Sequence, residues 1–207
     1  MTESGIVCVK IFTNFIYFHN VVQLKTGGDI LKRNLLKIAL VSLSAFSVLG
    51  VAGLTAQHTE AAINWMKPSQ TKAYPTWSKM TNPWVYVSTK NQKVYIHGNS
   101  KVKYTMYCST GTKSSPTPKG TYHIQQERGL SFYNPFSNEG ARYWVSWKGH
   151  GIYLFHSVPI NKLGTYLPSE AKYLGKKPHS HGCIRLSVAD AKWMYKTIPY
   201  GTKIVIK

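Results

Sequence analysis

The stretch His179-Ser180-His181-Gly182-Cys183-Ile184-Arg185-Leu186 places a thiol among imidazoles and a guanidinium. In cysteine catalysis the thiolate is the nucleophile, and neighbouring positive charge lowers the pKa of the thiol. His181 and Arg185 each lie two residues from Cys183 and could supply that charge. Gly182 permits a tight turn, so that nearby amide N–H groups can point at a developing oxyanion. The stretch predicts a nucleophile, although a buried cysteine without a chemical role is the commoner case.

A second imidazole in an unusual setting, His156, ends the apolar run Ile152–Phe155. Loops at strand ends often carry functional groups, so this histidine is a candidate base for the thiol of Cys183. The alternative is a core or edge histidine that is satisfied by a backbone carbonyl. Contact with the thiol would decide between the two interpretations.

Short runs of alternating apolar and polar residues begin at Pro83 and predict a mainly β domain. The predicted strands cover residues 84–88, 93–97, 101–109, 121–126, 142–147, 152–156 and 203–206. The polar residues 89–92 predict a hairpin between the first two strands. One face of the third strand consists of Val102, Tyr104, Met106 and Cys108. We therefore expect Cys108 to be buried in a strand rather than reactive.

One short helix is predicted directly after the candidate nucleophile. Ser187 is followed three residues later by Asp190, which is the pattern of a capping box. Apolar residues then recur at helical spacing at Ala191, Met194, Tyr195 and Ile198. Pro199 and Gly201 end the pattern.

The N-terminal part resembles an export signal in its charge layout. Residues 38–56 form an uncharged, mostly apolar run of 19 residues, and Lys32, Arg33 and Lys37 precede it. This layout predicts a secretory signal or membrane anchor, with the remainder of the chain outside the cytoplasm. Cleavage near Ala56 or Ala61 would release the chain, whereas an uncleaved segment would keep contact with the membrane.

These features divide the chain into three parts. Residues 1–56 are the N-terminal extension with the signal or anchor segment. Residues 57–82 are rich in Ser, Thr, Lys, Gln and Pro and predict a linker. Residues 83–207 are the predicted β domain.

The chain is strongly basic, with 26 Lys and Arg against 7 Asp and Glu and a net charge of +19. Such a field attracts polyanions. The basic residues are mostly single lysines and accompany no nucleic-acid motif, so anionic cell-envelope polymers are better candidates than nucleic acid. The three cysteines, Cys8, Cys108 and Cys183, argue against a disulfide framework because their number is odd.

Several segments together resemble one known family. The run Ser180–Arg185, with the upstream Phe155-His156-Ser157, is similar to the signature of the L,D-transpeptidase (YkuD-type) family. Ser109–Gly111, Thr117–Tyr122 and Pro199–Ile206 resemble further segments of that family, in the same order. The resemblance covers about residues 82 to 207.

The resemblance implies a β-sandwich-like catalytic domain and a two-step acyl transfer on peptidoglycan stem peptides, without a metal or cofactor. Cys183 would attack the carbonyl that joins an L-centre to a terminal D-residue. The D-residue would leave, and an amine would take the acyl group from the thioester. His156 would accept the thiol proton, and the carbonyl or hydroxyl of Ser157 would orient the imidazole.

The remaining roles implied by the resemblance concern the loop around the thiol and its substrate. Backbone amides of residues 181–183, which include His181 and Gly182, would form the oxyanion hole. Arg185 would anchor this loop or a substrate carboxylate. Ser180 and Tyr153 would contact the substrate.

The chain departs from the family pattern between His156 and Cys183, where 26 residues form a longer gap than usual. We expect the extra residues, from Ile160 to Pro178, to form a lid or rim over the cleft. Three lysines of this segment, Lys172, Lys176 and Lys177, could attract anionic wall polymers or peptide carboxylates.

Other interpretations of the same residues remain open. His179, His181 and Cys183 alternate, and His156 could complete a zinc site. A sortase also uses Cys, His and Arg, but its histidine lies further upstream and its cysteine does not follow Ser-His-Gly. Papain-like peptidases place the cysteine before the histidine. A non-catalytic, cationic wall-binding module would suit the charge but not the Ser-His-Gly-Cys cluster.

Overall fold

The computed structural model describes residues 62–207, so the predicted signal or anchor segment at residues 1–56 lies outside the described residues. Within the described part, no helix has the length and apolar character needed to cross a membrane. This part of the chain contains the strands β1 (Trp84–Ser88), β2 (Lys93–Gly98), β3 (Lys101–Ser109), β4 (Gly120–His123), β5 (Arg128–Asn134), β6 (Glu139–Lys148), β7 (Tyr153–Ser157), β8 (Ile184–Leu186) and β9 (Lys203–Ile206). Its helices are the 3-10 turn η1 (Trp77–Lys79), the short α2 (Pro168–Ala171) and α3 (Val188–Thr197).

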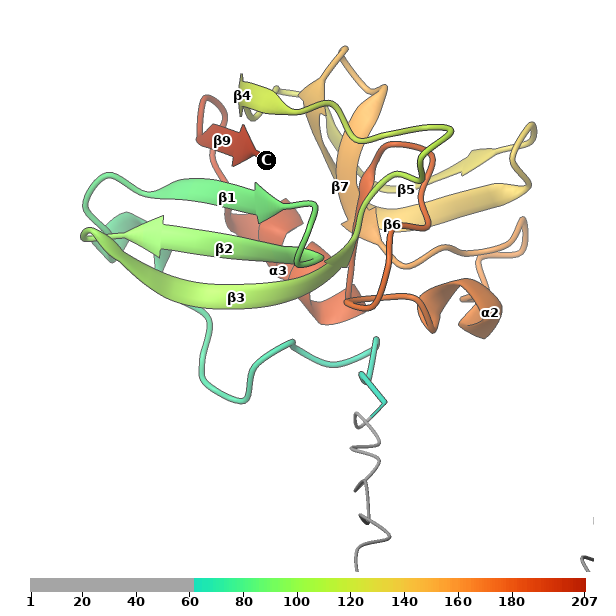
Figure 1. Cartoon of the computed structure of the whole chain (residues 1–207), viewed down its shortest axis with the longest axis horizontal. Coiled ribbons are helices and arrows are strands. Elements are labelled where there is room, and N and C mark those ends of the chain that lie inside the picture. The colour runs from blue at the N-terminus through green and yellow to red at the C-terminus, as the bar shows by residue number, and fades with distance from the viewer. Residues whose placement is uncertain (1–61) are drawn as a thin grey trace, which may run out of the picture. The chain divides into compact units, whose positions relative to one another are not determined.

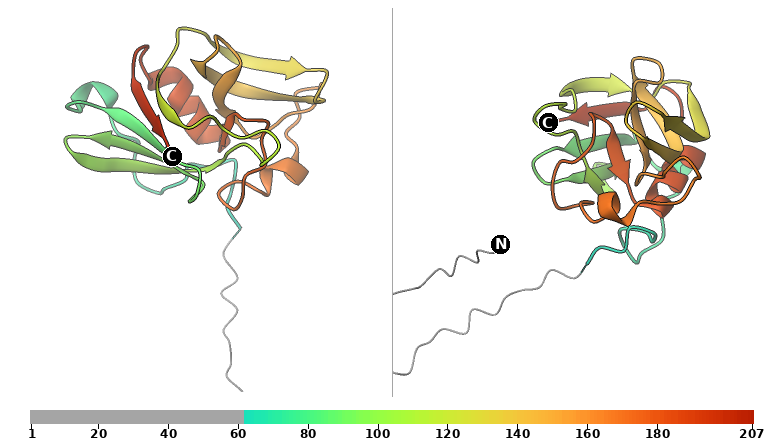
Figure 2. Two further views of the ribbon diagram at one scale, coloured as in Figure 1. Left: turned by 45° about the horizontal axis from the view of Figure 1, so that its top comes forward. Right: turned by 90° about the vertical axis from the view of Figure 1, so that its right-hand side faces the viewer.

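The strands form one curled sheet in the order β4-β9-β1-β2-β3-β8-β7-β6-β5 (Figure 1). Its two halves turn toward each other, with β3 and β8 at the junction (Figure 2). One hydrophobic cluster joins buried side chains of both halves with those of α3. This arrangement confirms the mainly β, sandwich-like domain with one clear helix after Cys183.

The sequence pattern located the first half of the sheet well. β1 and β2 pair antiparallel around residues 89–92, as expected for a hairpin, with Val87 opposite Val94. On β3 the side chains of Tyr104, Met106 and Cys108 are fully buried, and burial raises the pKa of the Cys108 thiol. Val102 was expected on the same face but is 47% exposed. The register of β2 and β3 shifts between Ile96 and His97, and this irregularity moves the end of β3 out of the alternation.

Three elements near the candidate nucleophile were not predicted. β8 is only three residues long and fully buried, so it shows no alternation that could reveal it. β5 has mixed burial because it lies at the edge of the sheet. The short α2 lies in the segment between β7 and β8. Of these elements, β5 and β8 contribute residues to the cavity that Cys183 lines.

Part of the predicted linker belongs to the folded domain instead. The hydroxyl of Ser69 and that of Tyr74 both donate to the carboxylate of Asp190 in α3, the latter at 2.6 Å. The side chain of Gln70 accepts from the backbone of Thr105 in β3 at 2.9 Å. Apolar side chains of the same stretch, among them Tyr74, Trp77 and Met80, pack against the main hydrophobic cluster. Composition alone cannot distinguish such a segment from a solvated linker.

The start of α3 is capped as predicted, but only in part. Ser187 accepts a hydrogen bond from the amide of Asp190 at 3.1 Å. In a complete capping box the acidic side chain would reach back to the cap residue. The Asp190 carboxylate binds Ser69 and Tyr74 instead and attaches residues 62–82 to the helix.

We expect Asp190→Ala to lower the free energy of unfolding by about 3 kcal/mol, because it leaves hydroxyl donors on Ser69 and Tyr74 without an acceptor. Urea denaturation measures this change. Glu127→Gln is the control, because that side chain is 38% exposed and pairs with the exposed His150 rather than with residues 62–82. An Asp190→Ala protein as stable as the control would contradict the attachment of residues 62–82.

Candidate active site

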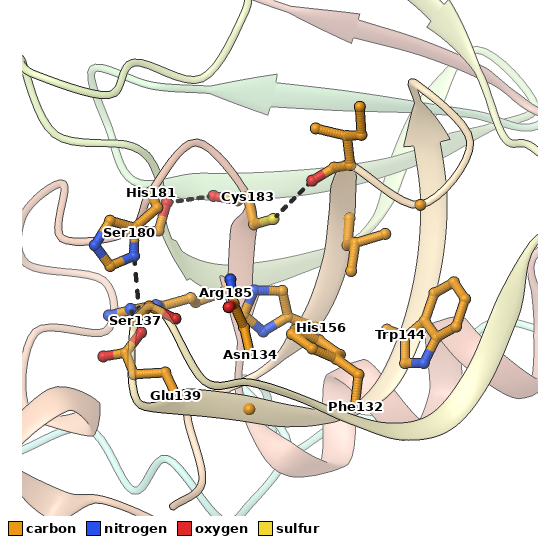
Figure 3. Close-up of a pocket in the computed structure, with 14 residues that line it drawn as sticks. Phe132, Asn134, Ser137, Glu139, Trp144, His156, Ser180, His181, Cys183 and Arg185 are labelled. Atoms are coloured by element: carbon orange, nitrogen blue, oxygen red, sulfur yellow. Dashed lines mark hydrogen bonds and ion pairs between the residues drawn. The ribbon is translucent and has the colours of Figure 1, made fainter.

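The pairing of β7 with β8 brings the two candidate catalytic residues together. The strands are parallel, with His156 opposite Arg185 and Phe155 opposite Ile184. Because side chains alternate along a strand, Phe155 and Ile184 enter the core, where both are fully buried. His156, Arg185 and Cys183, which directly precedes β8, lie on the other face and line a cavity of about 430 Å³ (Figure 3).

The rest of the cavity comes mainly from the β5–β6 hairpin. Its other lining residues are Phe132, Asn134, Ser137, Glu139, Gly140, Trp144, Gly151, Ile152, Leu154, Ser180 and His181. The expected lid, residues 160–178, contributes none of them. That segment packs beside the sheet instead, because Ala171 and Leu174 are buried in a second hydrophobic cluster with Val158. The hairpin, which the sequence did not predict, forms the rim.

The backbone before the thiol is held in a tight turn. Gly182 has φ +108°, and a Cβ at this position would come within 2.9 Å of the Tyr153 ring. Its carbonyl accepts from Thr117 Oγ1 at 2.9 Å, and that hydroxyl accepts from the Gly111 amide at 2.8 Å. The segments around Gly111 and Thr117 that resembled the family pattern therefore support the turn that carries Cys183.

We expect Gly182→Ala to slow acylation of the thiol by roughly 10- to 100-fold, because the strained backbone costs about 1–3 kcal/mol and the methyl group would collide with the ring of Tyr153. The rate of thiol acylation, followed by intact mass, measures the effect. Gly201→Ala is a suitable control, because Gly201 also has a positive φ but its added Cβ would meet nothing within 4 Å. Equal rates for both variants would contradict this role of Gly182.

The imidazole of His156 is oriented by the Ser157 carbonyl. Nδ1 lies 2.6 Å from that oxygen, and since a carbonyl only accepts, Nδ1 carries the hydrogen and Nε2 is left as the acceptor. The Ser157 hydroxyl does not take part, because it donates to the Val158 carbonyl and accepts from the Arg142 amide. Burial, assisted by the charge of Arg185, lowers the pKa of His156 to about 3. The imidazole is therefore neutral at neutral pH.

The thiol of Cys183 is half-buried, and its Sγ lies 3.6 Å from the Ile152 carbonyl, to which it can donate. Burial raises its pKa to about 11, against the opposing effects of a hydrogen bond from the Leu154 backbone and of the Arg185 charge. The Arg185 charge does lower the pKa of the thiol, as expected from the sequence, but desolvation is the larger effect and the net shift is upward. At rest the site contains a neutral thiol beside a neutral imidazole.

Arg185 anchors the loop through carboxylates that the sequence reasoning missed. Its side chain is 3% exposed and forms ion pairs with Glu139 and Glu170. The scarcity of acids was an available signal, since residues 57–207 contain only five. An acid that persists in so basic a domain is a candidate for a specific internal role.

Two predicted substrate contacts have other partners. Ser180 lines the cavity, but its hydroxyl donates to the Cys183 carbonyl at 2.6 Å and accepts from the Gly182 amide at 3.2 Å. Tyr153 is absent from the cavity lining and packs beside Gly182 and Trp147. Strand alternation explains this, because Tyr153 points to the face opposite Leu154.

The zinc interpretation lacks the required geometry. Over residues 62–207, no three His, Cys, Asp or Glu side chains are placed to hold a metal ion. His179 lies against Glu170 at 3.2 Å, and His181 lies 3.8 Å from Glu139. The two imidazoles that alternate with Cys183 thus contact two different carboxylates.

Comparison with known proteins agrees with this geometry. The model of the YkuD L,D-transpeptidase catalytic domain matches residues 82–206. The Bacillus subtilis (strain 168) protein named Putative L,D-transpeptidase YciB is 49% identical over 150 residues, which cover 71% of this chain and 76% of that protein.

Solved structures share the fold at lower identity. The LD transpeptidase LdtMt1 in complex with imipenem has a TM-score of 0.51 and 23% identity, covering 61% of this chain and 59% of that one. An L,D-transpeptidase from Mycobacterium tuberculosis H37Rv has a TM-score of 0.51 and 22% identity, covering 61% and 57%. The match thus spans less than two thirds of these solved chains. With its cysteine and histidine on one cavity, the chain belongs to the L,D-transpeptidase (YkuD) family of cysteine-nucleophile acyltransferases.

Proposed function

We propose that this chain is an exported transpeptidase that joins peptidoglycan stem peptides through a thioester on Cys183. The observation that supports this most directly is the pairing of a neutral His156, with its acceptor nitrogen Nε2 free, and a protonated Cys183 on one open cavity. An imidazole in this state can take the thiol proton only as the sulfur attacks. The family relationship supports the substrate class.

In the first step Cys183 Sγ attacks the carbonyl carbon between an L-centre and a terminal D-residue, and His156 Nε2 takes the thiol proton. The resulting oxyanion faces backbone amides of the turn. Of these, the Gly182 amide already donates to Ser180 Oγ, so the amides of His181 and Cys183 are the candidates for the oxyanion hole. The intermediate collapses when the imidazolium returns its proton to the leaving amine of the D-residue.

In the second step an amine of another stem peptide attacks the thioester carbonyl. His156 Nε2 accepts a proton from this amine, and the new amide forms as the thiolate leaves. The imidazolium then protonates the thiolate and restores the neutral pair. Water in place of the amine would give hydrolysis by the same steps, so access to the cavity determines the product.

The proposal is tested with a donor peptide that ends in an L-centre and a D-residue, together with an acceptor peptide that carries a free amine. Transpeptidation yields a product whose mass is the sum of both peptides minus that of the released free D-amino acid. Release of the D-residue without this product would identify a hydrolase instead. No release at all by a folded protein would refute the proposed function.

We also propose that the exported domain binds anionic wall polymers through its uncompensated lysines. Four acids of the domain already have partners and do not offset these lysines. Glu127 pairs with His150, Glu139 and Glu170 pair with Arg185, and Asp190 binds Ser69 and Tyr74. The Nζ atoms of Lys172 and Lys177 lie 5.0 and 4.2 Å from the centre of the Tyr173 ring, and all three lysines are exposed. Placement outside the cytoplasm rests on the basic flank and apolar run within residues 1–56.

Replacement of Lys172, Lys176 and Lys177 by Gln should weaken binding to isolated cell walls roughly tenfold at low salt, with little difference at high salt. Sedimentation of the protein with walls measures this. The matched control replaces three exposed lysines elsewhere, Lys101, Lys196 and Lys203. Equal weakening by both triple variants would show that net charge, not this segment, determines binding.

A further inference from the structure

A line of charged side chains beside the cavity includes two carboxylates that the proposed reaction does not use. Arg185 Nη1 donates to Glu170 Oε2 at 2.9 Å, and Nη2 donates to Glu139 Oε2 at 2.6 Å. His179 Nε2 lies 3.2 Å from the same Glu170 oxygen. His181 Nδ1 lies 3.8 Å from the same Glu139 oxygen. We refer to these five residues as the Arg185 network.

The network connects three separate parts of the fold at the thiol. Arg185 is two residues from Cys183 and opposite His156 on the neighbouring strand. Glu139 is the first residue of β6 and lines the cavity from the β5–β6 hairpin, beside Arg185 in Figure 3. Glu170 lies in α2, within the long segment between β7 and β8.

We propose that Glu139 and Glu170 are positioning residues of the thiol site, which act through Arg185 to hold the Cys183 strand against the cavity rim and α2. The inference rests on the proposed function only in taking Cys183 as the reacting group. It assigns a role to two residues that no sequence signature indicated. It also makes Arg185 an internal support rather than the anchor of a substrate carboxylate.

The burial of Arg185 supports this role. A guanidinium that is 3% exposed is costly unless it is paired, and here two carboxylates from different elements pair with it. An arginine normally binds a carboxylate through two parallel N–H bonds, but both terminal nitrogens are already engaged. Its Nε has no partner within residues 62–207 and is itself buried. A substrate carboxylate would therefore have to share the terminal nitrogens of Arg185 with Glu139 and Glu170.

The network also affects the electrostatics of the reacting pair. The positive charge of Arg185 lowers the pKa of both the Cys183 thiol and His156. The carboxylates of Glu139 and Glu170 pair with the same guanidinium, so in their ionised form we expect them to oppose this effect of the Arg185 charge. Removal of one carboxylate should therefore shift the thiol titration in a defined direction, downward, which a purely structural contact would not do.

The test uses full-length Glu139→Gln and Glu170→Gln, with Glu127→Gln as the matched control. Glu127 pairs with the exposed His150 and is absent from the cavity lining. The rate of Cys183 alkylation by iodoacetamide is measured against pH, with the site assigned by peptide mass. We expect the apparent thiol pKa to fall by about one unit in both variants and to stay unchanged in the control. Unchanged titration in both folded variants would overturn the proposal.

Two further variants cover the case in which the Gln variants do not fold. Glu139→Asp and Glu170→Asp keep the charge but shorten the reach, so the thiol titration should stay close to that of the wild type while acylation slows about tenfold. Wild-type acylation rates in both would overturn the positioning role. Because alkylation needs no peptide substrate, a failed transpeptidation assay would refute the proposed function without affecting this measurement.

Whether Arg185 binds a substrate carboxylate is tested in a separate experiment. The KM of a donor peptide is compared with that of its analogue in which side-chain carboxylates are amidated, using wild type and Arg185→Lys. If Arg185 is an internal support, the ratio of the two KM values agrees within about twofold between the proteins. A ratio that collapses toward one only in Arg185→Lys would show that Arg185 binds the substrate carboxylate and would overturn this part of the proposal.

Discussion

Cys183→Ala is expected to abolish covalent modification by a carbapenem. In the wild type, Sγ should attack the strained lactam carbonyl while His156 Nε2 takes the thiol proton, and the ring nitrogen then receives this proton. Nothing leaves, so the protein gains the full mass of the drug. Loss of the nucleophile should reduce the acylation rate by a factor on the order of 10⁴ or more. Intact mass spectrometry follows the adduct over time.

The other cysteines provide the controls for this experiment. Cys108 is fully buried in β3 and should not react in the folded protein, so Cys108→Ala should acylate like the wild type. Cys8 lies outside the described residues, and Cys8→Ala tests it directly. An adduct of equal yield on Cys183→Ala would refute the assignment of the nucleophile.

His156→Gln should have the second largest effect, a loss of roughly 10²- to 10⁴-fold in acylation rate at neutral pH. Because the thiol pKa is raised to about 11, very little thiolate exists without a base. The rate for His156→Gln should therefore rise about tenfold per pH unit up to the pKa of the thiol. The wild-type rate should change little between about pH 5 and pH 9, since His156 is neutral throughout that range. A wild-type profile that rises like that of the variant would contradict general-base catalysis.

The His156→Gln variant also tests the burial of His156, because a buried neutral imidazole makes the free energy of unfolding depend on pH. In the folded protein its pKa is lowered to about 3, whereas in the unfolded chain it is about 6.5. The unfolded state thus binds the proton first as the pH falls, and stability is lost between about pH 6.5 and pH 3. This contribution can reach about 1.4 kcal/mol per pH unit. In His156→Gln that part of the slope should be absent, as measured by urea denaturation at several pH values.

The sequence predicted those features that depend on residues close together in the chain. The Ser-His-Gly-Cys run identified the turn, and the structure gives Gly182 the positive φ that such a turn requires. The alternation of β3 and the cap at Ser187 were recognisable for the same reason, because each depends on residues within one element. The family resemblance extended these observations to the order of the strands.

Other features depend on contacts between distant residues. Residues 57–82 have the composition of a linker, yet Ser69 and Tyr74 bind a carboxylate more than 100 residues away. The irregularity between β2 and β3 exposes Val102. The cavity rim comes from the β5–β6 hairpin, whereas the long segment before Cys183 packs beside the sheet.

The sequence alone thus predicted which groups react, since the thiol, the imidazole and the tight turn are properties of residue types and short spacings. Tertiary structure decided their resting state. Burial keeps Cys183 protonated and His156 neutral, although the sequence suggested a thiolate stabilised by charge. Tertiary structure also decided the partners of Arg185, because the pairing of β7 with β8 and the position of α2 bring Glu139 and Glu170 to one guanidinium. Desolvation and ion pairing depend on what surrounds a group in space, and that neighbourhood exists only in the folded chain.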